Sequence, residues 1–225
     1  MHDLNVDVQT DLLKAIQGHA DGVSFEGKGL KFKDIRLSEI QLKTDDIDIN
    51  PLKVLLGEVE LDHPINLETR IVVEEADINE ALKLDLVRNL LYEFLTFHSD
   101  KLIVSMYPQT LQLHLPGNSR IEIEGKIVLD SGLEKKPLNL KADVRLESLE
   151  KPIILDSFKC NTPEGINLEV MNALIGKINQ VRKSPYFELK DAAIRITCIE
   201  VQQGSIILQA QAHLQKIPEN ISLKS

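Results

Sequence analysis

Long runs in which aliphatic and polar residues alternate restrict this chain to a sheet-rich fold. The aliphatic members of the longest run, over residues 35–73, are Ile35, Leu37, Ile40, Leu42, Ile47, Ile49, Ile65, Leu67, Ile71 and Val73. Successive side chains of a strand point to opposite faces, so a period of two buries one face and leaves the other in water. The pattern therefore predicts long strands with one wet face.

Within this run the alternation changes phase at Ser38-Glu39 and again at Asp45-Asp46. A change of one residue moves the apolar set to the other face unless the strand bulges or turns. We expect a long, bent strand at a sheet edge with bulges at both places. After Pro51, the run that ends at Gly57 is typical of a short helical turn. The alternation over 65–73 then predicts a strand of about nine residues, longer than average.

Residues 102–160 repeat the same alternation and predict a β-meander with one polar face. The sequence PGNS at 116–119 and the sequence DSGLEKKP at 130–137 are typical of turns between its strands. A final hairpin is expected over 191–201 and 205–215, with its turn at Gln202–Ser205.

Two segments have helical spacing instead, namely 76–97 and 166–183. The first carries one stripe of Leu82, Leu86, Leu90 and Phe94, with a second stripe of Leu84, Val87, Leu91 and Leu95 beside it. We expect a break near Lys83-Leu84. The second carries Met171, Leu174, Ile175, Ile178 and Val181, and Pro185 ends it. By periodicity alone, both stripes are more typical of a core than of a ligand-binding wall.

Charge and length limit the function classes. The 225 residues fit one domain and carry a net charge of −9, with a pI near 5.2. Phosphate binding needs clusters of Lys and Arg, so nucleic acid is not expected as a partner. No run approaches the ~18 apolar residues of a membrane-spanning helix, and MHDLNVDVQT is not a signal peptide. These features favour a cytoplasmic or peripheral membrane protein, although the abrupt start also fits a truncated N-terminus.

No motif predicts catalysis, a metal or a cofactor. Asp46-x-Asp48-x-Asn50 opens like a calcium loop, but Pro51 and Gly57 occupy the positions that need Gly and Glu. The histidines His63, His98, His114 and His213 lie singly, which indicates exposed or edge positions rather than ligands. The two cysteines, Cys160 and Cys198, are expected to be half-buried thiols, and a single disulfide between them stays open.

Three segments resemble the LmeA-like phospholipid-binding family, a bacterial family formerly described as a domain of unknown function. They are DIDINPLKVLLGEVELDHPINLETRIVVEEADINEAL (46–82), VSFEGKGLKFKDIRLSEIQLKTD (23–45) and IRITCIEVQQGSIILQAQAH (194–213). The family is related to tubular (TULIP/BPI-like) lipid-binding folds. The resemblance covers most of the chain and implies a single lipid-binding-like domain over 1–225. It implies an α+β fold in which a long, twisted antiparallel sheet wraps around two main helices.

The resemblance also implies a function without catalysis, namely binding of a phospholipid or similar amphiphile at or near a membrane, with transfer of that lipid left open. On this basis we expect an apolar slot between the two helices and the sheet. Its wall is predicted to contain Leu82, Leu86, Leu90, Phe94, Met171, Leu174, Ile175 and Ile178. Two alternatives stay open: a protein–protein or membrane-tethering scaffold with a filled core, and a lipid- or glycan-modifying enzyme.

Overall fold

The fold is described from a computed structural model of the 225-residue chain. The residues that the structure describes are 3–11, 14, 17–32, 34–48, 61–98, 103–130, 132, 134–151, 153–160, 176, 186–189 and 192–215. The predicted helix 166–183, apart from residue 176, and the predicted turn after Pro51 lie outside these residues.

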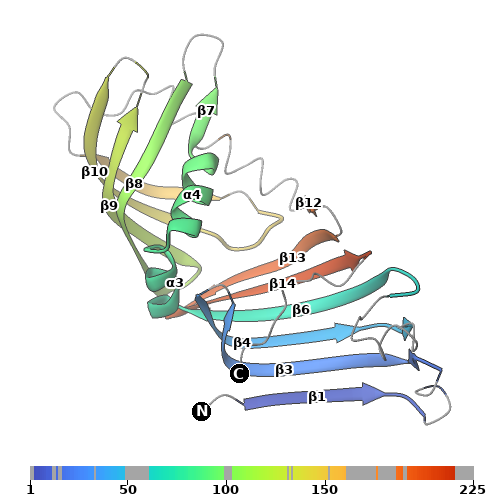
Figure 1. Ribbon diagram of the computed structural model, residues 1–225. Helices are drawn as coiled ribbons and strands as arrows, with labels where there is room; N and C mark the ends of the chain where they lie inside the picture. Colours follow the sequence, from blue (N-terminus) through green and yellow to red (C-terminus); the bar gives the residue numbers. More distant parts are fainter. Residues whose placement is uncertain are drawn as a thin grey trace.

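A seven-stranded antiparallel sheet forms one half of the described chain (Figure 1). In spatial order its strands are β1 (Asp3–Gln9), β3 (Gly22–Phe32), β4 (Ile35–Thr44), β6 (Ile65–Glu74), β14 (Ser205–Leu214), β13 (Ala192–Gln202) and β12 (Tyr186–Leu189). The predicted strand 65–73 is confirmed by β6. The C-terminal hairpin β13–β14 returns to pair with β6, from Ser205 opposite Glu74 to Leu214 opposite Ile65.

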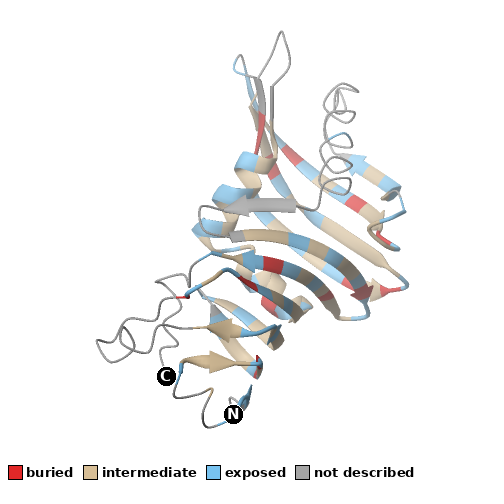
Figure 2. Ribbon diagram, turned by 90° about the vertical axis from the view of Figure 1, so that its right-hand side faces the viewer, coloured by how far each residue is buried: buried red, intermediate tan, exposed pale blue. Residues whose placement is uncertain are grey.

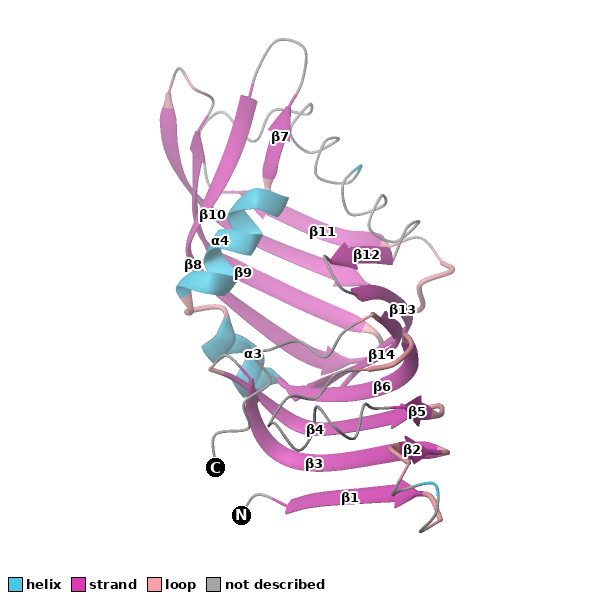
Figure 3. Cartoon of the chain, turned by 45° about the vertical axis from the view of Figure 1, so that its right-hand side comes forward, coloured by secondary structure: helices cyan, strands magenta, loops and turns pink. Residues whose placement is uncertain are grey.

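A five-stranded antiparallel sheet forms the other half, and it confirms the predicted meander. In spatial order its strands are β11 (Ile154–Cys160), β10 (Lys135–Arg145), β9 (Arg120–Asp130), β8 (Ile103–Gly117) and β7 (Thr96–His98). A short two-stranded sheet of β2 (His19–Ala20) and β5 (Ile47–Asp48) lies at one end of the seven-stranded sheet (Figure 3). The two main sheets replace the single long sheet that the sequence predicts.

The predicted turns are found where local chemistry demands them. Asn118 and Ser119 have φ values of 55° and 59°, and Gly117 pairs with Arg120 across them. Two successive left-handed residues give the twist that a tight two-residue hairpin needs. In the C-terminal hairpin Gln202 pairs with Ser205, which confirms the predicted position of its turn.

The predicted helix 76–97 is divided in two, as expected near Lys83-Leu84, but its predicted end is wrong, because residues 96 and 97 belong to strand β7. Helix α3 spans Glu75–Ala81 and helix α4 spans Asp85–Phe94. The break occurs because Leu84 has extended backbone angles, with φ −71° and ψ 137°. No helix among the described residues has the length and apolarity to cross a bilayer.

The two helices lie along the edge of β8 that β9 does not occupy, where they cap its backbone groups (Figure 1). Asn79 Nδ2 donates to the Leu113 carbonyl oxygen (2.8 Å), and Leu113 N–H donates to Asn79 Oδ1 (2.8 Å). Arg88 Nη2 donates to the carbonyl oxygens of Pro108 (3.2 Å) and Gln109 (2.9 Å). A long bare strand edge invites pairing with other chains, and these contacts cover it.

The prediction of a bulge at Ser38-Glu39 is wrong. β4 keeps one register with β3 on both sides of this point, with Glu39 opposite Lys28 and Leu37 opposite Leu30. Without a bulge, a change of phase in the alternation moves the apolar residues to the opposite face of the sheet, and here it does so in both strands. Gly29 of β3 has a left-handed φ of 67° here, a conformation that glycine adopts without steric cost.

Two further details of this region differ from the prediction. At Asp45-Asp46 the chain leaves the large sheet instead of bulging, since β4 ends at Thr44 and β5 begins at Ile47. β4 also lies inside the sheet, between β3 and β6, and not at its edge. The described part of the chain is thus α+β with antiparallel sheets, as predicted, and its described helices cover a strand edge.

Candidate functional site

One face of the seven-stranded sheet is apolar and turns toward the five-stranded sheet; we name it the inner face. At one end of it, Val201 and Ile206 pack in a cluster with Leu115 of β8. Alternate residues share a face, so the inner face continues away from this contact along each strand. Its members are Val23, Phe25, Ile40, Leu42, Thr44, Leu67, Thr69, Ile71, Ile194, Ile196, Ile199, Leu208, Ala210 and Ala212.

Strand register aligns these side chains in rows across the sheet. The central row is Phe25, Leu42, Thr69, Ala210 and Ile196, each opposite the next. Four strand spacings of about 4.8 Å make this row about 19 Å wide. The inner face is therefore a continuous aliphatic surface, interrupted by a few small or hydroxylated residues.

The inner face is only partly covered, whereas two compact clusters elsewhere are tightly packed. Leu115 is 1% exposed where the two sheets meet, and Met106, Ile127 and Leu138 are 2–3% exposed in the five-stranded sheet. In contrast, every residue of the central row is of intermediate burial, as Figure 2 shows for most of this sheet. Half-covered apolar surface on one continuous face is typical of a binding site.

The start of α3 joins the two sheets, a role that sequence reasoning missed. Asp77, with its side chain 10% exposed, lies 3.5 Å from Arg36 Nη1 and accepts a hydrogen bond from Ser38 Oγ (3.3 Å), both in β4. The next residue, Ile78, packs against the Leu115 cluster, and Asn79 binds β8 as described above. These residues belong to the acidic segment that carries the family resemblance, so that segment has a structural role here.

Glu75 adds a charged contact at the same joint. Its carboxylate accepts a hydrogen bond from Leu115 N–H (2.7 Å) and pairs with His114 Nδ1 (2.9 Å). Hydrogen bonding to His114 lowers the pKa of Glu75 below its ordinary value, and the same contact raises the pKa of His114. The sequence prediction that His114 is exposed is confirmed, since its side chain is 60% exposed.

The structure places only half of the predicted wall residues. Leu82 and Phe94 are half-buried, whereas Leu86 and Leu90 are 46% and 58% exposed on α4. The latter two lie on the side of α4 opposite Arg88, which faces β8. The other four predicted residues, Met171, Leu174, Ile175 and Ile178, lie outside the described residues. The wall and the slot between the two helices stay predictions.

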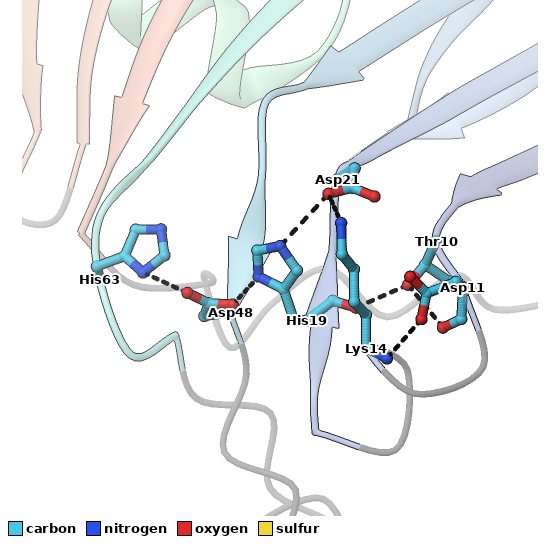
Figure 4. A network of polar contacts seen from close by, with 7 residues as sticks. All are labelled: Thr10, Asp11, Lys14, His19, Asp21, Asp48 and His63. Atoms are coloured by element: carbon cyan, nitrogen blue, oxygen red, sulfur yellow. Dashed lines mark hydrogen bonds and ion pairs between the residues drawn. The ribbon is translucent and has the colours of Figure 1, made fainter.

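A polar network lies at the opposite end of the seven-stranded sheet, where β2 pairs with β5 (Figure 4). The Asp48 carboxylate contacts Nδ1 of His19 with one oxygen and Nδ1 of His63 with the other (3.3 Å). Nε2 of His19 also faces Asp21 (3.5 Å), and Lys14 Nζ donates to that same Asp21 oxygen (2.6 Å). The hydrogen bond to Asp48 is the main reason that the pKa of His19 is raised above 6.5.

This network gives Asp48, the second aspartate of the calcium-loop-like sequence, a structural role. The Asp48 side chain is engaged by two imidazoles, and Asp62 N–H donates to the Asp48 carbonyl oxygen (2.9 Å). Among the described residues, no group of three His, Cys, Asp or Glu side chains is arranged to hold a metal ion. Cys198 is a free thiol whose pKa is raised mainly by burial.

The outer face of the sheet is polar over the half of the strands that lies away from the joint. Two shallow hollows, of about 550 and 350 Å³, lie on it. Their polar lining residues include Lys43, Glu68, Arg70, Arg195 and Gln211. The chemistry of these hollows differs from that of the inner face, so they do not mark an apolar ligand site.

Comparison with known proteins agrees with the resemblance of the three sequence segments. The model of a family described as LmeA-like phospholipid-binding matches residues 2–211, nearly the whole chain. No curated protein matches the chain. No solved structure matches it either. The chain therefore belongs to the LmeA-like phospholipid-binding family.

Proposed function

We propose that this protein binds phospholipid without catalysis and that the acyl chains lie on the inner face of the seven-stranded sheet. The observation that carries the proposal is the central row, five apolar or small side chains wide, which the rest of the described chain leaves half-covered. Membership of a phospholipid-binding family supports the ligand class.

The size and chemistry of the inner face suit an acyl chain. From Ile65 to Val73 the face extends eight residues along β6, about 26 Å at 3.3 Å per residue. One leaflet of a bilayer holds about 15 Å of hydrocarbon, so an extended chain fits within this length. Each buried CH₂ group contributes about 0.8 kcal/mol, without strong directional preference. We therefore expect these apolar contacts by themselves to discriminate weakly between acyl chains.

The predicted helix wall belongs to the same proposal. Leu86 and Leu90 are apolar and exposed, so they are available to a lipid tail or to the membrane from which a lipid is taken. Peripheral membrane contact and transfer of lipid between membranes are extensions of the binding function. The contribution of Met171, Leu174, Ile175 and Ile178 is tested by the same binding assay.

The two alternative functions make different demands on the chain. A scaffold with a filled core needs the inner face to be close-packed, whereas its central row is half-buried. An enzyme needs a cluster of perturbed acids or bases at a substrate site. The described cluster that comes nearest to this is His19–Asp48–His63, and it lies at the short β2–β5 pair, beyond the central row.

Tryptophan quenching tests contact between the lipid and the inner face. The chain contains no Trp, so one introduced Trp is the only indole fluorophore. We would place it at Leu42, on the inner face, or at the next residue, Lys43, which is exposed on the outer face. Phosphatidylcholine with brominated acyl chains is then added to each variant.

Bromine quenches indole only at short range. L42W should therefore be quenched in a saturable manner and shift to shorter wavelength, while K43W should change little. Equal quenching of both variants would indicate adsorption on the surface without a defined site. If neither variant is quenched and neither retains lipid, the scaffold function replaces the proposed one.

A further inference from the structure

One hydroxyl group in the middle of the inner face has no partner. Of the buried side-chain nitrogen and oxygen atoms in the described residues, Thr69 Oγ1 alone makes no hydrogen bond, and less than 1 Å² of its surface is exposed. Its neighbours across the sheet are Leu42 and Ala210, which offer no polar side-chain atom. A buried hydroxyl without a partner loses its hydrogen bonds to water and gains none, so it requires an explanation.

The other inner-face threonine shows that the sheet can satisfy such a group. Thr44 Oγ1 accepts a hydrogen bond from Val23 N–H (3.0 Å) and donates one to the Val23 carbonyl oxygen (3.3 Å). Thr44 therefore stabilises the pairing of β3 with β4. Thr69 lies in the adjacent strand, one row closer to the joint, and makes no such bond. The Thr69 hydroxyl, unlike that of Thr44, is therefore left without a partner among the described residues.

Thr69 is still partly exposed although its oxygen is not, so its remaining exposure belongs to other atoms. Rotation about the Cα–Cβ bond exchanges the positions of the hydroxyl and the methyl group, and both common rotamers are accessible in a strand. Register places the Thr69 side chain on the inner face, so a rotation of this kind is the step that would present its hydroxyl to a ligand there. There it would be a hydrogen-bond donor surrounded by aliphatic groups.

The position of Thr69 along β6 specifies which part of a lipid it meets. The inner face is closed at the joint, where Val73 lies opposite Ile206 of the packed Leu115 cluster. Four residues separate Thr69 from Val73, about 13 Å along the strand. The hydrocarbon of one lipid tail is about 15 Å long in a leaflet. A tail whose methyl end rests against the joint thus brings its ester group to the level of Thr69.

We propose that Thr69 is a ligand-binding residue whose hydroxyl donates a hydrogen bond to the ester carbonyl oxygen of a bound acyl lipid. This inference rests on the proposed function and adds a specificity to it. An ester-linked lipid offers a carbonyl acceptor at this level, whereas an ether-linked lipid with the same chains and headgroup does not. The protein therefore prefers diacyl to dialkyl phospholipids.

The test compares two phosphatidylcholines of equal chain length, one ester-linked and one ether-linked, with wild type, T69V, T69S and T197V. One neutral hydrogen bond corresponds to about a fivefold change in affinity. Wild type and T69S should bind the ester-linked lipid about fivefold more tightly, and T69V should bind both equally. T197V changes an exposed threonine on the outer face of the same sheet, so it serves as the control and should keep the ester preference.

Melting of the lipid-free variants gives an independent readout. T69V removes an unsatisfied hydroxyl and should raise the melting temperature by about 2–4 °C, while T44V should lower it by a similar amount. An ester preference that persists in T69V, or that is absent from wild type, refutes the role of Thr69 and leaves the proposed function intact. Failure of wild type to bind either lipid refutes the proposed function itself.

Discussion

Substitution of Asn79 by alanine tests whether α3 joins the two sheets. The Asn79 side chain makes two hydrogen bonds of 2.8 Å with the backbone N–H and C=O of Leu113 in β8. Both backbone groups lie on the edge of β8 that β9 does not occupy. Removal of the amide therefore deletes two hydrogen bonds and leaves two half-buried backbone groups unpaired.

The expected loss of stability follows from these two bonds. Each is worth about 1 kcal/mol net, and an unpaired buried group adds up to about 1–3 kcal/mol. Water reaches the half-buried Leu113 in part, and alanine favours the helix over asparagine by about 0.5 kcal/mol. We expect N79A to lower the free energy of unfolding by about 2 kcal/mol. N79D keeps the acceptor but loses the donor, so it should fall between N79A and wild type.

Urea denaturation followed by circular dichroism measures this difference. Glu80 is the matched control because it is exposed on the same helix and its described ion pair, with Lys83, lies at the surface. E80A should change the unfolding free energy by less than about 0.5 kcal/mol. If N79A and E80A prove equally mild, the bonds to Leu113 do not hold the joint, and the role of α3 derived from them is refuted.

Three further predictions concern other parts of the molecule. L115A should cost about 3–5 kcal/mol because Leu115 is 1% exposed, while L90A, at a residue 58% exposed, should cost less than about 1 kcal/mol; equal losses in thermal melts would contradict the core assignment. The pKa of His19 is raised in the folded state, so its contribution to stability is fully present below pH 6.5 and disappears as the pH rises through the folded-state pKa. The free energy of unfolding should therefore depend less on pH in H19Q than in wild type between pH 5.5 and 8.5. An unchanged pH profile would show that the pairing of His19 with Asp48 does not affect folding. Micromolar calcium should leave the melting temperature unchanged, since the sequence after Asp48 lacks the calcium-loop glycine and glutamate; a calcium-dependent rise that is lost in D48A would overturn this.

The sequence alone determined the strands, the turns and the composition of each face. The alternation over 65–73 and over 102–160 has a period of two, which only a strand can satisfy with one buried face. The turns at 117–120 and 202–205 depend on residues close together in the chain, so local chemistry was sufficient to place them. The break in the helix near Leu84 was equally local.

Tertiary structure alone decided which distant segments meet. β6 pairs with β14, where Glu68 contacts Gln211, 143 residues further along the chain, and no local pattern encodes that register. Likewise His19 and Asp48 are 29 residues apart, so spacing rules for ligand motifs could not detect their contact. Alternation marked Thr69 as an inner-face residue, but its lack of a partner became visible only once β4 and β14 were placed beside it. A face is a property of one strand, whereas a hydrogen-bond partner is a property of its neighbours.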